Sequence, residues 1–518
     1  MPGSKDQKGG SAGADALMEG VPRGKSWAYL RHQTPPQARW LEPALIAESK
    51  TLTYDPEKPG GKLLFGAFGD KLIGIRDNRH VLTVAGIRAG KSVTVISNLF
   101  FYDGSVFAID PKAELANKTA GARKALGQRV YVLDPFEITK GAAAQCRARF
   151  NPLARLTLDN RTIVEDAYQI ADGLVISTGE EKDPHWNEAA KGFLIGLILF
   201  VAVSVVVKDE DRHLGTVRSL VNQALDRHED GTFLILQLAL STVRRLTALK
   251  YPDLAGAIEG AYRGFYAKSS EELGSVLSTV HRHTQFLDYA AMKSVLGGHD
   301  VDLTDLKADP KGVTIYLCLP ATRMGLCNRW FRILLNQLFD AMEREEREPD
   351  SNVLVCLDEF PVLGFMNQLQ DAAGQIASFH VTLWVIIQDW GQGKALYKER
   401  WESFAANSGI LQAFGNVDLA TTEYLSKRLD KTLVQISRPG EAGPEQREKG
   451  MTGRSETFEL YDLLTPSEVA LLFARNDKKH RQLLLWAGVN PMVIQRVTYY
   501  DREGPLAPYM ARLAANGG

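Results

Sequence analysis

The chain has 518 residues, of which 45% are hydrophobic and 24% charged, a composition typical of a globular protein with more than one domain. Its 61 lysines and arginines are balanced by 62 aspartates and glutamates, which excludes a basic field over the whole surface and confines any nucleic-acid contact to a local groove or pore. The four cysteines form no CxxC pair, so we expect reduced packing residues in a cytosolic protein, with neither a zinc site nor a disulfide framework indicated.

Residues 1–45 are expected to form a flexible N-terminal segment. The stretch up to about Lys25 is rich in glycine, alanine and serine and has no apolar core of the kind that a signal peptide needs. From Leu52 to Asp77, short apolar runs alternate with glycine and aspartate, a pattern that predicts hairpin strands.

The stretch Val81–Ser92, VLTVAGIRAGKS, predicts a strand, a phosphate-binding loop and the start of a helix. Lys91 would lie along the β- and γ-phosphates of ATP, and the Ser92 hydroxyl would hold Mg²⁺. The usual loop pattern has glycine where Ala85 stands, so alanine serves there only if the position does not need positive φ. The residues predicted to bind the nucleotide are Ala85, Gly86, Ile87, Arg88, Ala89, Gly90, Lys91, Ser92 and Val93.

Apolar strands alternate with helical segments after this loop, which predicts an α/β domain whose parallel sheet is covered on both faces. Ser105–Asp110 and Val130–Asp134 are the next two strands. Both end in aspartate, at the edge where parallel sheets bind their ligands.

Helical periodicity replaces the strands from about Arg161 to Leu306. The long apolar run Phe193–Val207 has fifteen residues, short of the roughly 20 that span a bilayer. We therefore interpret it as a buried core helix that continues from Trp186, and we expect no transmembrane helix in this chain. The remaining predicted helices are Val164–Ile176, Leu214–Arg227, Phe233–Leu249, Leu254–Ala267 and Ser275–Leu296.

The second half of an ATPase site is predicted at Asp358 and Glu359, directly after the apolar run Val353–Leu357. Asp358 would hold Mg²⁺ through water, and Glu359 would take a proton from the attacking water. A strand end with two solvated acids is the structural alternative. Asp110 and Asp134 are rivals for the metal role, but neither has an adjacent acid to serve as base.

Gln388 ends the next strand, Val381–Gln388, and is predicted to contact the γ-phosphate as the third catalytic residue beside Lys91 and Glu359. A polar residue that only caps the strand is the alternative. Later in the chain, Ser437–Ser455 is interpreted as an exposed loop, and Leu483–Ala487 with Met492–Tyr499 predicts a closing hairpin.

These features predict a nucleotide-binding domain in two parts, 46–160 and 307–500, with an all-α inserted domain at 161–306 and a C-terminal tail at 501–518. A long helix, Met324–Arg344, follows the first strand of the second part. The insert explains why Lys91 and Asp358 lie so far apart in the sequence.

Short motifs in this order resemble those of the type IV secretion coupling proteins, the TraG/TraD-type conjugative DNA-transfer ATPases, which are related to FtsK/HerA-type DNA pumps. The resemblance covers roughly Leu63 to Tyr500. It is carried by AGIRAGKS (Ala85–Ser92), DPKAEL (Asp110–Leu115), VLDPF (Val132–Phe136), FNPL (Phe150–Leu153), WNEAAKGFLIGLI (Trp186–Ile198), LDEFPVLG (Leu357–Gly364), the Gln388 strand and LYDLLTPSEV (Leu460–Val469).

The resemblance implies a RecA-like P-loop ATPase that uses ATP and Mg²⁺, works as a homo-hexamer and brings relaxase-bound single-stranded DNA to a type IV secretion channel. A coupling ATPase for protein effectors only, or a non-translocating adaptor, are the alternatives. Family members usually begin with transmembrane helices, whereas we expect none in this chain. We therefore expect a cytoplasmic protein at the inner face of the cell membrane: either a partner supplies the membrane contact, or the chain is a soluble member that docks on the secretion channel.

An arginine would reach across the subunit interface of such a ring, but this sequence has Gly374–Ser378 where some relatives carry a basic stretch. Basic positions are candidates for DNA contact, although a solvated helix face is the preferred interpretation of each of them. They are Arg244, Arg245, Lys250, Arg329 and Arg332, with His281–His283 as a candidate pH-sensitive patch.

Overall fold

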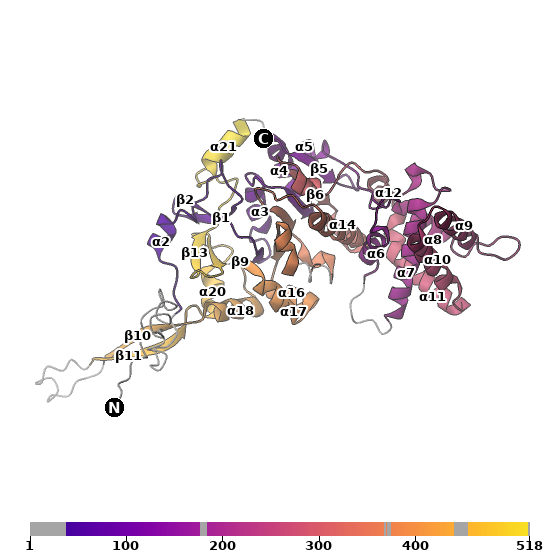
Figure 1. Cartoon of the computed structure of the whole chain (residues 1–518). Helices are drawn as coiled ribbons and strands as arrows, with labels where there is room; N and C mark the ends of the chain where they lie inside the picture. The colour runs from indigo at the N-terminus through magenta and orange to yellow at the C-terminus, as the bar shows by residue number, and fades with distance from the viewer. Residues whose placement is uncertain (1–37, 177–183, 367–368, 370–373, 440–453, 516–518) are drawn as a thin grey trace, which may run out of the picture.

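The computed structural model describes residues 38–176, 184–366, 369, 374–439 and 454–515 (Figure 1). An eleven-stranded sheet has the order β2-β1-β13-β12-β9-β3-β8-β7-β4-β6-β5. The strands from β9 to β5 pair in parallel, and β12, β13, β1 and β2 extend the sheet in antiparallel fashion. The strands are β1 (Leu63–Phe68), β2 (Lys71–Ile75), β3 (His80–Ala85), β4 (Val106–Asp110), β5 (Arg129–Leu133), β6 (Val313–Cys318), β7 (Val353–Leu357), β8 (Val381–Ile387), β9 (Ser408–Phe414), β10 (Lys431–Pro439), β11 (Arg454–Asp462), β12 (Arg481–Trp486) and β13 (Met492–Gln495).

Helices make up most of the remaining described residues. They are α2 (Pro43–Glu48), α3 (Lys91–Leu99), α4 (Glu114–Ala125), α5 (Gly141–Ala144), α6 (Ile163–Leu174), α7 (His185–Val203), α8 (Leu214–Asn222), α9 (Leu234–Ala248), α10 (Pro252–Tyr266), α11 (Ser270–Thr284), α12 (Ala290–Leu296), α13 (Asp305–Ala308), α14 (Met324–Arg344), α16 (Trp390–Tyr397), α17 (Arg400–Ala406), α18 (Leu419–Leu429), α20 (Pro466–Leu472) and α21 (Ala507–Ala515).

The parallel part of the sheet is covered on both faces, as the apolar strands predict. Successive side chains of a strand point to opposite faces, and β7 shows the result. Val353, Val355 and Leu357 join the core that α14 and α16–α18 cover, whereas Leu354 and Cys356 join the core under α3 and α4. The α/β prediction is therefore confirmed.

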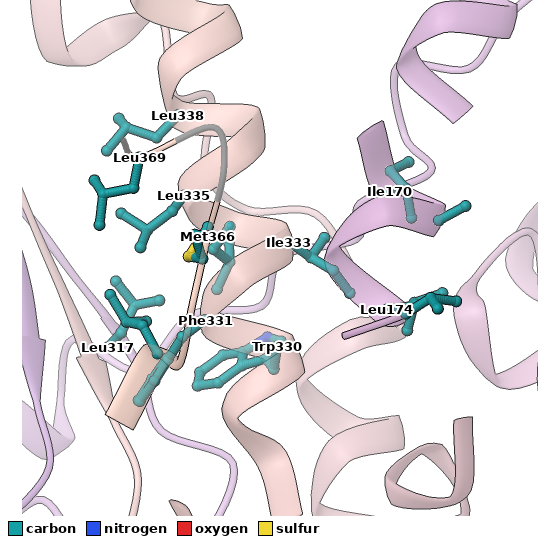
Figure 2. Close-up of a cluster of buried hydrophobic side chains, with 14 of the residues drawn as sticks. Ile170, Leu174, Leu317, Trp330, Phe331, Ile333, Leu335, Leu338, Met366 and Leu369 are labelled. Atoms are coloured by element: carbon teal, nitrogen blue, oxygen red, sulfur yellow. The ribbon is translucent and has the colours of Figure 1, made fainter. Parts of the chain in front are cut away.

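The helices α6–α12 gather at one end of the molecule, beyond α14 (Figure 1). Figure 2 shows α14 between the two parts: Phe331 lies with Leu317 of β6 on one side, and Ile333 faces Ile170 and Leu174 of α6 on the other. Contact with α6 is so close that a Cβ atom at Gly173 would lie 2.8 Å from Ile333 Cγ1. The helical part and the sheet thus share one continuous hydrophobic core.

The second half of helix α7, Gly196 to Val203, is buried on all sides, which explains its apolar sequence. Phe193, Leu197 and Phe200 are fully buried, and Phe193 stacks on Phe265 with ring centroids 3.7 Å apart. Among the described helices, α7 alone is long and apolar enough to cross a membrane, but 72% of its most apolar window is buried within the structure. This burial agrees with the interpretation as a core helix. The predicted extension to Val207 is wrong: α7 ends at Val203, and Val205 and Val206 are exposed.

Two further sequence interpretations need correction. The helix predicted at Ser275–Leu296 is in fact α11, a short 3₁₀ turn at Gln285–Asp288 and α12. The exposed loop predicted at Ser437–Ser455 begins and ends inside a two-stranded sheet, β10 with β11, whereas residues 440–453 lie outside the described residues. In Figure 1 this hairpin projects from the end of the molecule opposite the helices α6–α12.

The closing hairpin predicted near the C-terminus is confirmed as β12 and β13. Before it, α20 begins with a capping box in which the Thr465 side chain accepts from the Glu468 N–H and the Glu468 carboxylate accepts from the Thr465 N–H.

Residues 1–37, and most of the predicted N-terminal segment with them, lie outside the described residues. Ala38 donates its N–H to the Lys431 carbonyl.

Candidate nucleotide-binding site

The predicted phosphate-binding loop joins β3, which ends at Ala85, to α3, which begins at Lys91. Two glycines shape it. Gly90 precedes the helix with φ 103°, a conformation that favours glycine. Gly86 has no room for a side chain, because a Cβ atom there would lie 1.9 Å from the Gly415 carbonyl oxygen. The usual pattern places a glycine at position 85. In this chain the residue that needs to be glycine, because the backbone of another segment lies against it, is Gly86.

Ala85 does not have positive φ, which is the condition that the sequence set for an alanine at this position. It is the fully buried last residue of β3, and its side chain packs in a small cluster with Ala89 and Phe414. Arg88, by contrast, has φ 57° at the exposed tip of the loop.

Arg496, just after β13, connects the loop to the segment before β12. Its Nη1 donates to the Ala89 carbonyl at 3.0 Å, and its Nη2 donates to the Arg475 carbonyl at 3.3 Å. The guanidinium also lies 5.3 Å from the centroid of the Phe414 ring, and burial lowers the pKa of Arg496. The phosphate loop is thus fixed to the C-terminal strands of the sheet.

Asp358 lies directly after β7 and faces the start of α3, because β7 and β3 flank β8 in the sheet. Ser92 Oγ donates to Asp358 Oδ2 at 3.2 Å. The other oxygen, Oδ1, is buried and accepts no hydrogen bond from the described residues. Burial raises the pKa of Asp358 to about 6, against the lowering effects of Lys91 and the Ser92 hydrogen bond.

These two residues fit a magnesium ion. A hydroxyl and a carboxylate supply the oxygen ligands that Mg²⁺ prefers, directly or through water. The unpartnered Oδ1 is a buried polar atom of the kind that usually has a partner in a folded protein. Ser92 and Asp358 therefore form a set of donors on which a hydrated divalent cation can be held.

Lys91 and Glu359 line the same depression, which has a volume of about 460 Å³. Burial lowers the pKa of Lys91, whereas the carboxylates of Glu359 and Asp358 act to raise it. Glu359 is half-exposed at the turn before a 3₁₀ helix, Phe360–Leu363. The lining residues are Ile87, Arg88, Gly90, Lys91, Ser92, Val93, Asp110, Pro111, Lys112, Glu114, Asp358, Glu359, Gln388 and Tyr500.

Sequence comparison places the chain among known proteins. The family described as "Type IV secretory system Conjugative DNA transfer" matches residues 40–516. The chain belongs to this family. A conjugal transfer protein TraG of Escherichia coli is 27% identical over 407 residues, covering 75% of this chain and 61% of that protein. The coupling protein VirD4 of Bartonella henselae is 24% identical over 471 residues, covering 87% of this chain and 68% of that protein. The chain thus spans about three fifths of the length of the TraG relative.

Solved structures of the conjugative coupling protein TrwB have the same fold. An unbound form, TrwBdeltaN70, has a TM-score of 0.60 at 15% identity and covers 90% of this chain and 95% of that one. A TrwB complex with the ATP analogue ADPNP has a TM-score of 0.59 at 14% identity, covering 90% of this chain and 96% of that one. The RecA-like fold expected from the family resemblance is therefore confirmed.

Asp110 and Asp134, the two alternatives considered for the metal role, instead accept hydrogen bonds from backbone N–H groups. The Asp110 carboxylate accepts from the N–H groups of Glu114 and Ala116, at 2.9 and 2.8 Å, and so begins α4. Asp134 accepts from the N–H groups of Ile138 and Thr139, at 3.1 and 2.8 Å. Asp358 alone of the three has an oxygen that is buried without a partner in the described chain.

Gln388 lies one residue beyond β8, at the edge of the depression. Its N–H donates to Gln392 Oε1 at 2.9 Å, and its carbonyl accepts from Asn416 Nδ2 at 3.1 Å. These bonds use its backbone and leave the side chain at the site.

Four residues of the depression were missed by sequence reasoning: Pro111, Lys112, Glu114 and Tyr500. The first three lie in the DPKAEL motif, whose position directly after the end of a strand was the available signal. Tyr500 is 63% exposed and lies beside Tyr499, which packs on Phe100, the residue directly after α3. No local pattern links Tyr500 to the phosphate loop.

The basic positions considered for DNA contact differ in how far they are exposed and in what they contact. Arg332 is buried and donates to the carbonyls of Leu363 and Phe365, so the interpretation of a solvated helix face is wrong for this residue. Arg245 donates to the Val203 carbonyl at 3.1 Å. Arg244 and Lys250 are exposed. Arg329 meets His283, a contact between two elements that the sequence did not connect.

Proposed function

We propose that this chain is an ATP-hydrolysing coupling protein that recruits relaxase-bound single-stranded DNA to a type IV secretion channel or translocates it there. The observation that carries the ATPase part is the contact of Ser92 with Asp358, beside Lys91 and Glu359 in one depression. TrwB structures in complex with ADPNP and with ADP and Mg²⁺ support the choice of nucleotide and metal. Membership of the conjugative DNA-transfer family supports the transport role.

In this proposal, the loop N–H groups from Gly86 to Val93 and the Lys91 ammonium bind the phosphates. Ser92 and Asp358 would hold Mg²⁺, which when bound would supply positive charge beside the phosphate oxygens. Glu359 accepts a proton from water while the water oxygen attacks the γ-phosphorus. The bond from the γ-phosphorus to the bridging oxygen breaks, and ADP leaves with that oxygen.

Gln388 connects this chemistry to movement. Its side chain lies at the depression, and its backbone contacts Gln392 of α16 and Asn416 after β9. The Gln388 side chain would contact the γ-phosphate before hydrolysis, and this contact would be lost when the phosphate leaves. Loss of the contact would then shift Gln392 and Asn416. The change would then reach α16 and the segment between β9 and α18.

The active form is proposed to be a homo-hexamer with nucleotide between neighbouring subunits, docked on the cytoplasmic side of the cell membrane through a channel partner. Six copies multiply the few charges that one subunit contributes to a pore, so a nearly neutral chain is compatible with binding to DNA.

Hydrolysis of ATP by the purified chain, measured with and without single-stranded DNA alongside the oligomer mass, tests the proposal. We expect DNA to raise the rate and to promote a hexamer, and Lys91→Ala to abolish hydrolysis. A rate that DNA leaves unchanged would contradict the pump and favour a coupling ATPase for protein effectors. Transfer that persists in Lys91→Ala would favour the adaptor, in which nucleotide only holds the assembly together.

A further inference from the structure

Two hydrogen bonds fix Gln388 to the first turn of α16. The Gln388 N–H donates to Gln392 Oε1 at 2.9 Å, and the Gln392 N–H donates to Asp389 Oδ1 at 2.9 Å. Asp389 is the N-cap of α16, so these bonds hold the start of the helix against the end of β8. A displacement of Gln388 would therefore move α16 with it.

Helix α16 packs on α17 through a glycine and a tryptophan (Figure 1). A Cβ atom at Gly393 would lie 2.1 Å from Trp401 Cε2 and 2.3 Å from Trp401 Cδ2, so the helix backbone lies directly on the indole. Trp401 is fully buried, and its Nε1 has no hydrogen-bond partner among the described residues. The contact between the two helices thus depends on the shape of the indole and not on a hydrogen bond.

Trp401 also packs on Phe360, the residue directly after Glu359. The centroids of the two rings are 6.2 Å apart. Tyr397 of α16 and Phe404 of α17 lie against the same phenyl ring, with centroids at 5.6 and 5.9 Å. Phe360 is 1% exposed, so its ring is held by side chains of both helices.

Glu359 depends on this neighbour for its position. Within the part of the chain that the structure describes, its carboxylate forms no hydrogen bond. The Glu359 carbonyl accepts from the Val362 N–H at 3.1 Å, which begins a 3₁₀ turn, and Arg332 donates to the Leu363 carbonyl at the far end of that turn at 3.1 Å. The direction of the carboxylate therefore follows from the backbone, which the buried Phe360 ring fixes at the near end.

We propose that Trp401 is a positioning residue for Glu359. It passes the position of Gln388 to the carboxylate through its contacts with Gly393 and Phe360. While Gln388 contacts the γ-phosphate, α16 lies against the indole and the carboxylate is placed to take a proton from the attacking water. Without the phosphate, α16 shifts against the indole and the carboxylate leaves this geometry. The proposal rests on the proposed function for the roles of Gln388 and Glu359.

Gly393→Ala and Trp401→Phe test the contact from its two sides, because one adds a methyl group to α16 and the other removes part of the indole. We expect the rate of ATP hydrolysis at saturating ATP to fall roughly 10- to 100-fold in Gly393→Ala and about tenfold in Trp401→Phe. Affinity for a fluorescent ATP analogue should stay within about twofold of the wild type. The added methyl group fits the space that the smaller ring leaves, so G393A/W401F should recover to within about threefold of the wild-type rate.

A double-mutant cycle separates this role from a general loss of packing. If Gln388 acts through α16, the loss of rate in G393A/Q388A should be at least about fivefold smaller than the product of the two single losses, whereas independent defects multiply. Gly196→Ala is the matched control, since Gly196 is a buried helical glycine of α7 whose Cβ atom would lie 2.7 Å from Ala261 Cβ. It should lower the melting temperature and leave the rate at saturating ATP unchanged.

Trp401→Phe provides the test if Gly393→Ala does not fold, because it removes an indole N–H that has no partner in the described chain. A wild-type rate at saturating ATP in a folded Trp401→Phe protein would overturn the proposal, as would losses in Gly393→Ala and Gln388→Ala that simply multiply. The proposed function fails differently: a wild-type chain that neither binds nor hydrolyses ATP would overturn it. Hydrolysis that requires Glu359 but tolerates Trp401→Phe would overturn only the positioning role.

Discussion

The Ser92 hydroxyl donates a hydrogen bond of 3.2 Å to Asp358, which lies 266 positions later in the chain. The contact joins the phosphate loop to the strand end that carries Glu359, and it brings both halves of the candidate site together. It also leaves Asp358 Oδ1 buried without a partner among the described residues, so the ionised carboxylate is costly in the protein without magnesium.

This cost predicts a dependence of stability on pH. Burial raises the pKa of Asp358 from 3.8 to about 6, so the folded chain binds more protons than the unfolded chain between these values. The free energy of unfolding should therefore fall as pH rises from about 4 to 6, and Asp110, whose pKa is raised to about 7, acts in the same direction.

Asp358→Asn removes the buried charge. Without magnesium, this variant should be more stable than the wild type at pH 7, by at most about 3 kcal/mol, and should lose most of the difference at pH 4. Thermal unfolding with and without MgATP checks both points, since the variant should also lose its stabilisation by magnesium nucleotide. Equal melting temperatures for the two proteins at both pH values would contradict the assignment.

Glu359→Gln should separate binding from hydrolysis. The amide keeps the shape of the side chain but cannot take a proton from water, so ATP hydrolysis should fall roughly 10²- to 10⁴-fold. Affinity for a fluorescent ATP analogue should stay within about twofold of the wild type. Lys91→Ala is the control in which affinity is lost as well. Hydrolysis that survives in Glu359→Gln would assign the base to another residue.

The parts of the site predicted from sequence are those that a local pattern encodes. An apolar strand followed by Gly90-Lys91-Ser92, and another followed by Asp358-Glu359, each fix a strand end and its chemistry within a few residues. Helix α14 was predicted with its observed bounds, Met324–Arg344, because its apolar positions recur with helical spacing over many turns. The inserted-domain boundaries at 161 and 306 stay a prediction.

The parts that were missed depend on contacts between distant segments. Arg496 lies 407 positions from Ala89, and no local sequence pattern indicates that its guanidinium donates a hydrogen bond to the phosphate loop. Strands β10 and β11 were not predicted. Glycine, proline and charged residues dominate Ser437–Ser455, which was interpreted as a loop, and the paired strands lie mainly outside that stretch. This sheet forms through backbone hydrogen bonds between the two strands, and amino-acid composition does not indicate such pairing.

Neighbouring loop positions should respond very differently to small substitutions. Ala85→Gly removes one methyl group from the contact with Ala89 and Phe414 and should leave ATP affinity nearly unchanged, at a cost in stability of about 1 kcal/mol. Gly86→Ala places a Cβ atom 1.9 Å from the Gly415 carbonyl oxygen, which forces the backbone apart. We expect it to abolish nucleotide binding. Calorimetric titration with ATP measures both, and a large gain of affinity in Ala85→Gly would show that residue 85 needs the freedom of glycine.

Tyr500 offers a test of how the nucleotide base is bound. Its ring is exposed at the rim of the depression that contains Lys91. Base stacking on an aromatic ring contributes about 1–3 kcal/mol, so Tyr500→Ala should weaken ATP binding about tenfold or more and Tyr500→Phe should not. Tyr461, exposed on β11, is the matched control for removal of a tyrosine. Inorganic triphosphate should bind equally well to all four proteins, and a loss of its affinity in Tyr500→Ala would point to the phosphate loop instead.

Arg496 should affect nucleotide affinity more than turnover. Arg496→Ala removes the hydrogen bonds to the Ala89 and Arg475 carbonyls, so the phosphate loop loses its attachment to the segments around β12 and β13. Binding of ATP would then have to order the loop again, which should raise Kd about tenfold while hydrolysis at saturating ATP changes little. Arg512→Ala, which removes an exposed arginine paired with Glu57, is the control for lost charge. If Arg496→Ala lowered the maximal rate and left Kd unchanged, Arg496 would act on the reaction itself and not on the loop.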